Sequence, residues 1–551
     1  MINNKITSFV AVLALASVAS CTSMDELEPQ GGSMLASQYE ATVAAVPQRA
    51  DAVFTGMYTK LGDPLSYGNF SSDRPDDFGF IMMAFSNDLE ASDIAMPNIG
   101  YNWFSACGDL TSRNADYANP YIRYRGVYDE IARAHDVMNA YGDVTEETSA
   151  DVRARVGQAY AIRAFCYLNI APYFQFRYAE HQEDPCVPIV TRETVDVANN
   201  PRATVKEVYD LILSDLTTAI EYLEGYQRPD KSKIDQQVAY GLRARAYLNM
   251  EKWEEAAEDA AKAAAGYTPS SIADCSKPSF CKITEPNWLW GYDMTPDVAK
   301  TYPYATSSAW IRSFSADGYT PATQCYAFIN NLLYNKIPDT DVRKGWWVNE
   351  DLYSPLLEGL TFPNPDGGVL VGQEIATANI ADVKATFLPY TNVKFACDPI
   401  GTTLNDEDWP FMRVEEMLLI QAEALYKSGK TAEGIKVLND FVKTYRDPAY
   451  NAELTGRKFE DEVWFQRRVE LWGEGFANND TRRLGKPFVR FHDNNSNIPD
   501  AFRFNVAADD RWLLMRFCTT ELNFNEGIED NEGGNLPVMG QNKTLRDGVT
   551  D

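Results

Sequence analysis

Apolar residues recur at helical spacing in long segments of the chain. Residues 49–61 and 124–141 carry them three and four positions apart, and residues 153–176 continue this pattern as far as Pro172. Thr204 and Glu207 have the spacing of a capping box and precede a further amphipathic stretch. The periodicity predicts a mostly α-helical fold.

Two segments combine this periodicity with small residues at regular intervals. In residues 246–264, Ala256 and Ala263 are seven positions apart, and small residues there let two antiparallel helices approach closely. Residues 422–442 repeat the pattern more weakly, with Gly434 in place of the expected alanine. Both segments resemble tetratricopeptide-type helix hairpins, but they are too far apart for a regular solenoid.

The composition and the periodicity of the chain change between about residues 268 and 412. Pro, Gly, Asn, Asp and Thr are frequent there and the helical period is weak, and the chain after about residue 485 is similar. We expect a helical scaffold covered by a large loop-rich layer. Long ordered loops in a compact protein usually carry function.

The amino terminus has the features of an export signal. Lys5 precedes an apolar run at residues 6–19, which is too short to span a bilayer as a helix. The run ends in Val-Ala-Ser-Cys21, which resembles the lipobox of bacterial lipoproteins, and acidic residues follow as in lipoproteins exported to the Bacteroidetes surface. We therefore predict a signal peptide at residues 1–20, lipidation at Cys21 and a tether at residues 21–36. A secreted protein with a chance cysteine is the alternative.

Composition narrows the classes of function. Lys and Arg total 50 against 79 Asp and Glu, a net charge of −29 that repels nucleic acid and anionic lipid. Three histidines disfavour a multi-histidine metal site, and we predict no cofactor. The acidic run at residues 406–408 permits a calcium ion without indicating one. The sequence holds no GxSxG, HExxH or P-loop motif, so no enzyme is predicted.

Eight cysteines remain besides Cys21, and none forms a CxxC pair. Cys275 and Cys281 are close enough in sequence to close a small disulfide loop outside the cell. Free buried thiols are the alternative, and Cys166 lies in an apolar helical run that favours this.

Several motifs together resemble the SusD/RagB family of outer-membrane nutrient-binding lipoproteins. They lie at residues 160–167, 188–191, 203–216, 413–423 and 464–485. The last motif departs from the family pattern, because the chain has Gln466, Ala477 and Thr481 where the family usually has Glu, Arg and Leu. Its charged residues are expected to form a structural network and not a ligand site: Arg467, Arg468, Glu470, Glu474, Asp480 and Arg482.

The resemblance implies a SusD-like fold in which tetratricopeptide-type helices contact a SusC-like TonB-dependent transporter. It implies an N-terminal helical region at residues 37–230 and a C-terminal region at residues 231–551 that contains the loop-rich insertion. It also implies a lipid-anchored protein on the extracellular side of the outer membrane that captures oligosaccharides and delivers them to the transporter. Capture of peptides, as in the RagB branch, is an alternative.

Aromatic residues indicate where a sugar would bind. Pyranose rings have apolar C–H faces on which aromatic side chains stack, and hydroxyl edges that suit amides and acids. Residues 286–347 hold five of the eleven tryptophans, and residues 87–103 combine aromatics with amides and acids. We expect part of these rings to be exposed. The candidate ligand-binding residues are Asn87, Asp88, Tyr101, Trp103, Trp288, Trp290, Tyr292 and Trp310.

Two other interpretations stay open besides capture of peptides. Buried tryptophans that anchor loops would leave only a tetratricopeptide-type adaptor for a protein partner. The chain is so rich in acids that a pair of carboxylates suited to glycoside hydrolysis is available by chance, although no motif indicates such an enzyme. Calorimetry against glycans separates a sugar-binding protein from an adaptor.

Overall fold

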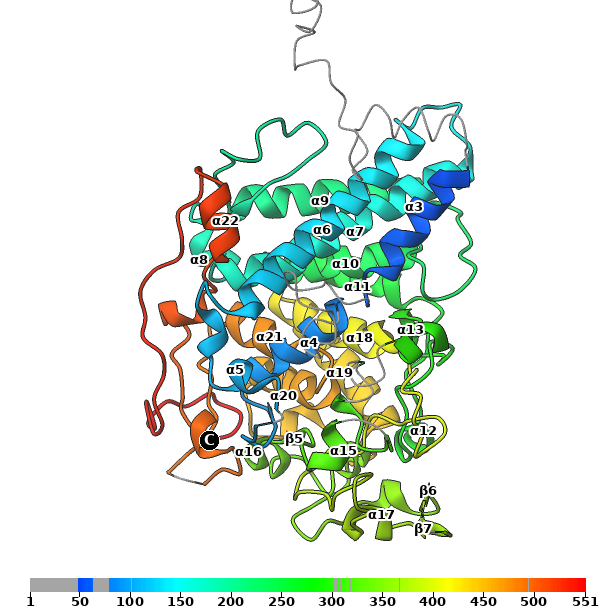
Figure 1. Ribbon diagram of the computed structural model, residues 1–551, viewed down its shortest axis with the longest axis vertical. Coiled ribbons are helices and arrows are strands. Elements are labelled where there is room, and N and C mark those ends of the chain that lie inside the picture. Colours follow the sequence, from blue (N-terminus) through cyan, green and yellow to red (C-terminus); the bar gives the residue numbers. More distant parts are fainter. Residues whose placement is uncertain are drawn as a thin grey trace, which may run out of the picture.

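The computed structural model describes residues 48–62, 79–100, 102–301, 306, 310–316, 319–365, 367–493 and 495–551. Long helices fill its upper and middle parts, and a loop-rich region lies at its lower end (Figure 1). The fold is mostly α-helical, as predicted, with the loop-rich layer laid against a helical scaffold. The predicted signal peptide, Cys21, the tether and Tyr101 lie outside the described residues.

The upper helices are built around one central helix, α7. Ser149 caps it by accepting a hydrogen bond from the backbone N–H of Val152, and the helix continues through Pro172, where the sequence had predicted its end. The capping box is confirmed, since Thr204 and Glu207 bond each other's backbone N–H groups at the start of α9. The helices of this part are α3 (Gln48–Thr59), α6 (Ala118–Tyr141), α7 (Ala150–Phe174), α8 (Tyr178–His181) and α9 (Val205–Tyr222).

Both predicted helix hairpins are present. The first consists of α10 (Gln236–Asn249) and α11 (Trp253–Ala264), and the second of α18 (Val414–Lys427) and α19 (Thr431–Tyr445). A Cβ atom on Gly434 would lie 2.7 Å from the carbonyl oxygen of Ala422 and 2.8 Å from the backbone nitrogen of Tyr426. Glycine therefore replaces the usual alanine because the backbones of α18 and α19 are in close contact.

The remaining α-helices of the described residues have at most 12 residues each. They are α4 (Gly79–Glu90), α5 (Ser105–Gly108), α12 (Ile272–Cys275), α13 (Pro296–Thr301), α15 (Tyr319–Thr323), α16 (Asn331–Tyr334), α17 (Glu374–Thr377), α20 (Phe459–Glu470), α21 (Ala477–Arg483) and α22 (Thr519–Phe524).

Strands within the described residues form four antiparallel pairs. They are β1 (Ile94–Ala95) with β5 (Phe328–Ile329), β2 (Pro185–Pro188) with β3 (Arg202–Thr204), β4 (Trp288–Tyr292) with β8 (Trp409–Arg413), and β6 (Thr361–Pro363) with β7 (Val369–Val371). All ten residues of β4 and β8 are buried, so this ribbon lies inside the protein. The pairing of β1 with β5 joins the N-terminal region to the loop-rich layer.

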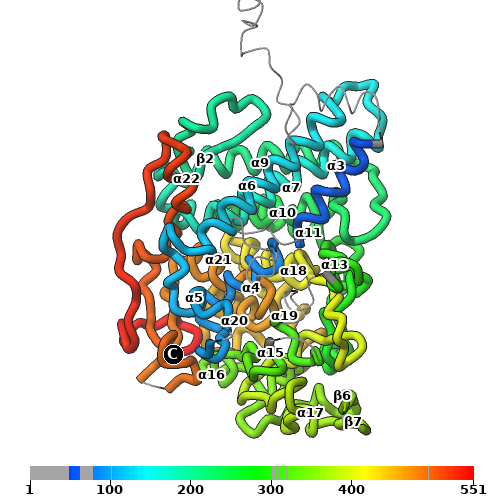
Figure 2. Tube along the Cα trace, viewed as in Figure 1, coloured from blue at the N-terminus to red at the C-terminus, as the bar shows by residue number. Residues whose placement is uncertain are grey.

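The carboxyl-terminal segment runs along one side of the helical scaffold (Figure 2). The backbone N–H of Glu526 donates to the carbonyl oxygen of Ala198 at 2.7 Å. Near the end of the chain, the carboxylate of Asp547 pairs with Arg468 at 2.7 Å. These contacts fasten the last residues of the chain to elements far away in the sequence.

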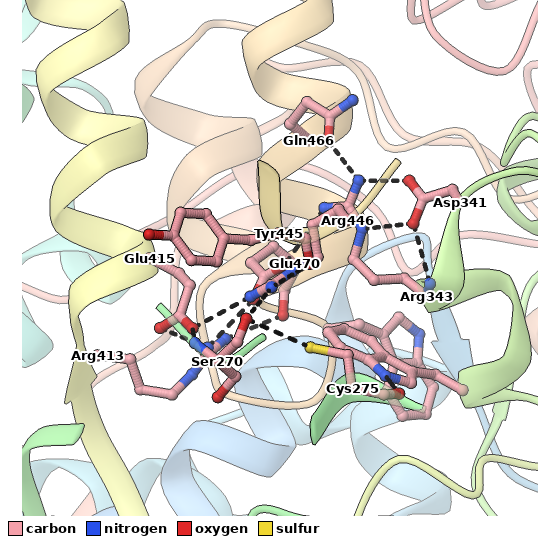
Figure 3. Close-up of polar contacts among 12 residues, drawn as sticks. Ser270, Cys275, Asp341, Arg343, Arg413, Glu415, Tyr445, Arg446, Gln466 and Glu470 are labelled. Carbon is pink, nitrogen blue, oxygen red and sulfur yellow. Dashed lines mark hydrogen bonds and ion pairs between the residues drawn. The ribbon is translucent and has the colours of Figure 1, made fainter. Parts of the chain in front are cut away.

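A buried network of ion pairs joins the loop-rich layer to the second hairpin (Figure 3). Glu470 accepts hydrogen bonds from Arg446 at 2.7 and 2.8 Å, from Arg413 at 3.1 Å and from Arg343 at 3.2 Å. Although burial alone would raise it, these guanidinium groups hold the pKa of Glu470 well below its usual value. The six residues predicted to form a charged structural network are all buried and bonded to protein groups.

Cys275 and Cys281 are separate thiols, as are the other six cysteines of the described part of the chain. The disulfide alternative is therefore wrong for this structure, and the alternative of free thiols holds. No helix among the described residues is long and apolar enough to cross a membrane.

Candidate functional site

Trp103 is the one candidate aromatic residue in the described part of the chain whose ring is well exposed. Its side chain is 40% exposed, and Ile99 on the same loop is 36% exposed. Asn102 holds this loop in shape, because its side chain donates to the carbonyl oxygen of Pro97 at 2.9 Å and accepts from the backbone N–H of Phe104 at 3.0 Å. The hydrogen bonds of Asn102 thus fix the backbone around Trp103, and the indole lies at the surface. We call residues 96–100 and 102–104 the Trp103 loop.

A buried aromatic cluster supports the loop from below. Phe104 contacts Phe85 of α4 edge to face, with ring centroids 5.0 Å apart. It also contacts Trp310, from the loop-rich layer, with centroids 5.1 Å apart and an interplanar angle of 70°. Edge-to-face pairs of this kind add to the stability gained by burial. The two zones chosen from the sequence therefore meet, through the residue next to Trp103.

A small hollow, with room for about one water molecule, lies at the base of the Trp103 loop. Asn102, Phe104 and Arg490 contribute to its walls. Arg490 is buried and donates to several backbone carbonyl groups, among them those of Ala91 at 2.8 Å and Phe502 at 3.1 Å. Burial lowers its pKa to about 10. The arginine thereby holds the backbone on both sides of the loop, at Ala91 and Gly108, against the carboxyl-terminal part of the chain.

Asn87 and Asp88 are buried, so they do not belong to an exposed surface around Trp103. Asp88 accepts hydrogen bonds from the backbone N–H groups of Gly475 and Ala477, both at 2.9 Å. Asn87 donates to the carbonyl oxygen of Gly475 and accepts from the hydroxyl of Tyr173. Burial raises the pKa of Asp88 to about 7, against the opposing effect of its two hydrogen bonds. The pair fastens the end of α4 to the start of α21.

The aromatic residues of β4 are also buried. Trp288 and Trp290 are 0% exposed and Tyr292 is 6% exposed. Trp290 packs between Phe165 and Phe411, with ring centroids 4.9 and 4.8 Å away. The prediction that these rings are exposed is wrong, because β8 and helix α7 cover the strand that carries them.

Burial extends to every tryptophan between residues 286 and 347. Trp310, Trp346 and Trp347 are at most 1% exposed. The high density of tryptophan in this segment therefore reflects the core that holds the loop-rich layer together. Of the candidate residues described, only Trp103 is exposed.

Sequence reasoning passed over the neighbours of Trp103. Asn98 and Ile99 are exposed beside it on the same loop, and the Pro-Asn-Ile-Gly sequence at residues 97–100 is a recognisable turn signal. An exposed indole with an amide and an aliphatic side chain beside it suits an amphipathic ligand. Among the described residues, no group of three or more His, Cys, Asp and Glu side chains is placed to hold a metal ion.

Comparisons with known proteins agree with this architecture. A family described as starch-binding and associating with the outer membrane matches residues 81–248, and the SusD family matches residues 278–533. A SusD-like protein of Formosa agariphila is 22% identical over 410 residues, which are 69% of this chain and 75% of that protein.

Solved structures show the same fold. A SusD-like carbohydrate-binding protein of Bacteroides vulgatus superposes with a TM-score of 0.67 at 23% identity, over 87% of this chain and 96% of that one. A SusD superfamily protein of Bacteroides thetaiotaomicron gives 0.65 at 18% identity, over 88% and 99% of the two chains. A laminarin-binding SusD-like protein gives 0.61 at 16% identity, over 88% and 99%.

Proposed function

The chain belongs to the SusD/RagB family, and from this premise we propose that it captures oligosaccharides at an aromatic site centred on Trp103. The exposed indole is the observation that carries the proposal. A flat aromatic face on a fixed loop covers the apolar face of a pyranose ring without a large loss of side-chain entropy. The ligand-binding names of relatives support a sugar as the ligand, since one is a carbohydrate-binding protein and another binds laminarin.

Trp310, one of the predicted site residues, has a supporting role in this proposal, together with two neighbours of Trp103. Phe104, Trp310 and Asn102 hold the Trp103 loop in place and do not contact the sugar. Sugar hydroxyls would bond to groups that lie beside the indole, of which Asn98 is exposed on the same loop. Affinity would then depend on the shape of the loop as well as on the indole itself.

The protein acts, in this proposal, at the extracellular face of the outer membrane. Lipid attached to Cys21 anchors it, because two or more acyl chains give stable membrane attachment. A SusC-like TonB-dependent transporter receives the oligosaccharide, and energy comes through that transporter. The family description, which names association with the outer membrane, supports this location.

Binding without chemistry is the proposed mechanism, and the protein is not an enzyme in this account. The family is described by what it binds, and no reaction is part of that description. Release of new reducing ends from a glycan incubated with the purified protein would contradict this part of the proposal.

Isothermal titration calorimetry against a panel of glycans tests the proposed function. The panel includes oligosaccharides prepared from starch and from laminarin. The matched family is described as starch-binding, and one protein of similar fold is described as laminarin-binding. At least one glycan is expected to give saturable heat. Absence of heat with every glycan, together with binding of a peptide library, would favour the peptide-binding alternative instead.

A further inference from the structure

A second cleft lies inside the helical scaffold, away from the Trp103 loop. A water-sized sphere can reach about 90 Å³ of space in it, and the cleft is partly open to solvent. Helices α4, α7, α10 and α21 contribute most of its walls. The residues of the Trp103 loop do not line it.

The walls of the cleft combine aromatic rings with amides. Phe80 and Phe165 pack with ring centroids 4.9 Å apart, and Phe411 lies 5.7 Å from Phe165. Phe476 is half-buried beneath the guanidinium of Arg245, which lies 5.1 Å from the ring centroid. Four asparagines share the lining with these rings: Asn87, Asn169, Asn249 and Asn479.

Charges in the cleft are compensated by partners within the protein. Arg245 pairs with Glu416 at 2.7 Å, and Arg467 pairs with Asp480 at 2.7 Å. The third acid of the lining, Glu474, is bonded to Arg413 and Lys394 at 2.7 Å. The third arginine, Arg483, pairs with Asp480 at 2.8 Å and with Glu423 at 2.6 Å. A ligand that carries a net charge would find no uncompensated counter-charge here, so the chemistry favours a neutral one.

Several polar atoms that line the cleft are nevertheless uncommitted. The side chain of Asn479 makes no hydrogen bond with any described residue. Within the same part of the chain, Nη1 of Arg245 donates to no protein atom, while its other nitrogens bond Glu416 and the carbonyl oxygen of Phe411. The Oδ1 atoms of Asn169 and Asn249 accept no hydrogen bond there, although the amide nitrogen of each donates one. Hydrogen-bond donors and acceptors beside the aromatic rings of the cleft are thus available to a ligand.

The cleft adjoins a second hollow. Asn249, Asn479 and Arg483 also line a smaller neighbouring hollow, bordered by Tyr178 and Tyr209. The rings of these two tyrosines meet edge to face, 5.2 Å between centroids. Asn479 therefore lies where the two spaces adjoin, and its amide is within reach of a ligand in either of them.

We propose that this cleft is a second binding site, for a short neutral saccharide of one or two sugar units. Amides and Nη1 of Arg245 would bond the hydroxyl groups, and the phenylalanine rings would cover the apolar faces of the sugar. Ligand charge is excluded by the ion pairs already formed, and ligand length is limited by the enclosing helices. The inference uses neither Trp103 nor its loop, so it stands or fails separately from the proposed function.

Binding of maltose and of laminaribiose to the purified protein tests the second site. Titrations compare the unmodified chain with three variants: Trp103→Ala, Asn479→Leu and Asn535→Leu. Leucine at position 479 keeps the volume of the side chain and removes an amide that makes no bond within the described protein, so folding is expected to be retained. Asn535 is an exposed asparagine that does not line the cleft, and its variant is the matched control.

We expect at least one of these disaccharides to bind the Trp103→Ala and Asn535→Leu variants as tightly as the unmodified protein. The Asn479→Leu variant is expected to bind it about tenfold more weakly, because a sugar hydroxyl loses its partner. Equal affinity of the Asn479→Leu variant, or loss of disaccharide binding in the Trp103→Ala variant, would overturn the inference. So would the absence of binding to the unmodified protein, even if longer glycans bind.

A second measurement needs no variant. Crystals of the unmodified protein soaked with the disaccharide are expected to show the sugar in contact with Asn479 and Arg245. Sugar found only at the Trp103 loop, or an empty cleft at saturating disaccharide, would contradict the inference whatever the variants do.

Discussion

The ring of Phe104 meets the ring of Trp310 edge to face, with centroids 5.1 Å apart. More than two hundred positions separate these residues in sequence, so the contact holds the Trp103 loop against the loop-rich layer. The exposed indole of Trp103 is therefore held in place by residues from the N-terminal region and from the loop-rich layer. One loop thus carries a buried ring, Phe104, and an exposed ring, Trp103, at neighbouring positions.

Two glycine substitutions separate helix propensity from close packing. Gly56 lies in α3 with open space around the position of a Cβ atom, so Gly56→Ala should stabilise the protein by about 0.5–1 kcal/mol. Gly434→Ala should destabilise it in spite of the same gain in propensity, because the new methyl group would collide with the backbone of α18. Urea denaturation measures both. Equal stabilisation by the two changes would show that α18 and α19 are not in close contact.

Removal of the charge on Glu470 is expected to destabilise the fold strongly. Glu470→Gln leaves the buried guanidinium groups of Arg446, Arg413 and Arg343 without their shared anion. Breaking such buried pairs costs about 3–5 kcal/mol. The free energy of unfolding from urea denaturation measures the loss.

Asp440→Asn is the matched control for this substitution. Asp440 pairs with Lys436 on the exposed face of α19, where an ion pair contributes less than about 1 kcal/mol. A loss of similar size in the two variants would contradict the structural role of the Glu470 network.

Asp88 should make the protein less stable as the pH rises from about 4 to 7. Its pKa is about 7 in the folded protein and about 3.9 in an unfolded chain, so in this window the native state binds the proton more tightly. The contribution of Asp88 to the free energy of unfolding therefore falls as the pH rises from about 4 to 7. Above pH 7 this contribution no longer changes with pH. Asp88→Asn should remove that part of the slope in urea denaturation measured across this pH range.

The comparison for Asp88→Asn is its slope against pH and not its absolute stability, because an amide offers one acceptor where the carboxylate accepts two backbone hydrogen bonds. An unchanged slope would show that Asp88 does not hold its proton in the folded state.

Periodicity in the sequence was sufficient to predict the helical scaffold. The hairpins at α10–α11 and α18–α19 follow from small residues at fixed intervals, because helix packing depends on side-chain size at positions close together in sequence. The charged segment around Glu470 was also interpreted correctly as structural.

Exposure of the aromatic residues could not be predicted in the same way. Trp288 and Trp290 lie in a segment rich in turn residues, yet β8, more than a hundred residues later, pairs with their strand and covers it. Local sequence reports that a tryptophan needs a large contact area, but not whether protein or ligand provides it. Trp103 differs in that it lies on a short surface loop whose backbone Asn102 bonds. The cleft around Asn479 could not be predicted either, because four separate helices form its walls.

Attachment of lipid is predicted at the first residue after the signal peptide. Cys21→Ala should release the protein from the membrane fraction, since no acyl chain can then be linked to the side chain at that position. Labelling of growing cells with radioactive palmitate measures the modification. Persistent label on the Cys21→Ala variant would place the lipid elsewhere or exclude a lipobox.

The affinity of the Trp103→Ala variant for the glycan that gives the strongest heat tests the central claim most directly. Calorimetry should show binding weakened by about 1–3 kcal/mol, the size of a lost aromatic contact, with thermal unfolding unchanged. Phe524→Ala, at a ring of α22 that is 58% exposed, should bind like the unmodified protein. Affinity that is unchanged in the Trp103→Ala variant would contradict an oligosaccharide site centred on Trp103.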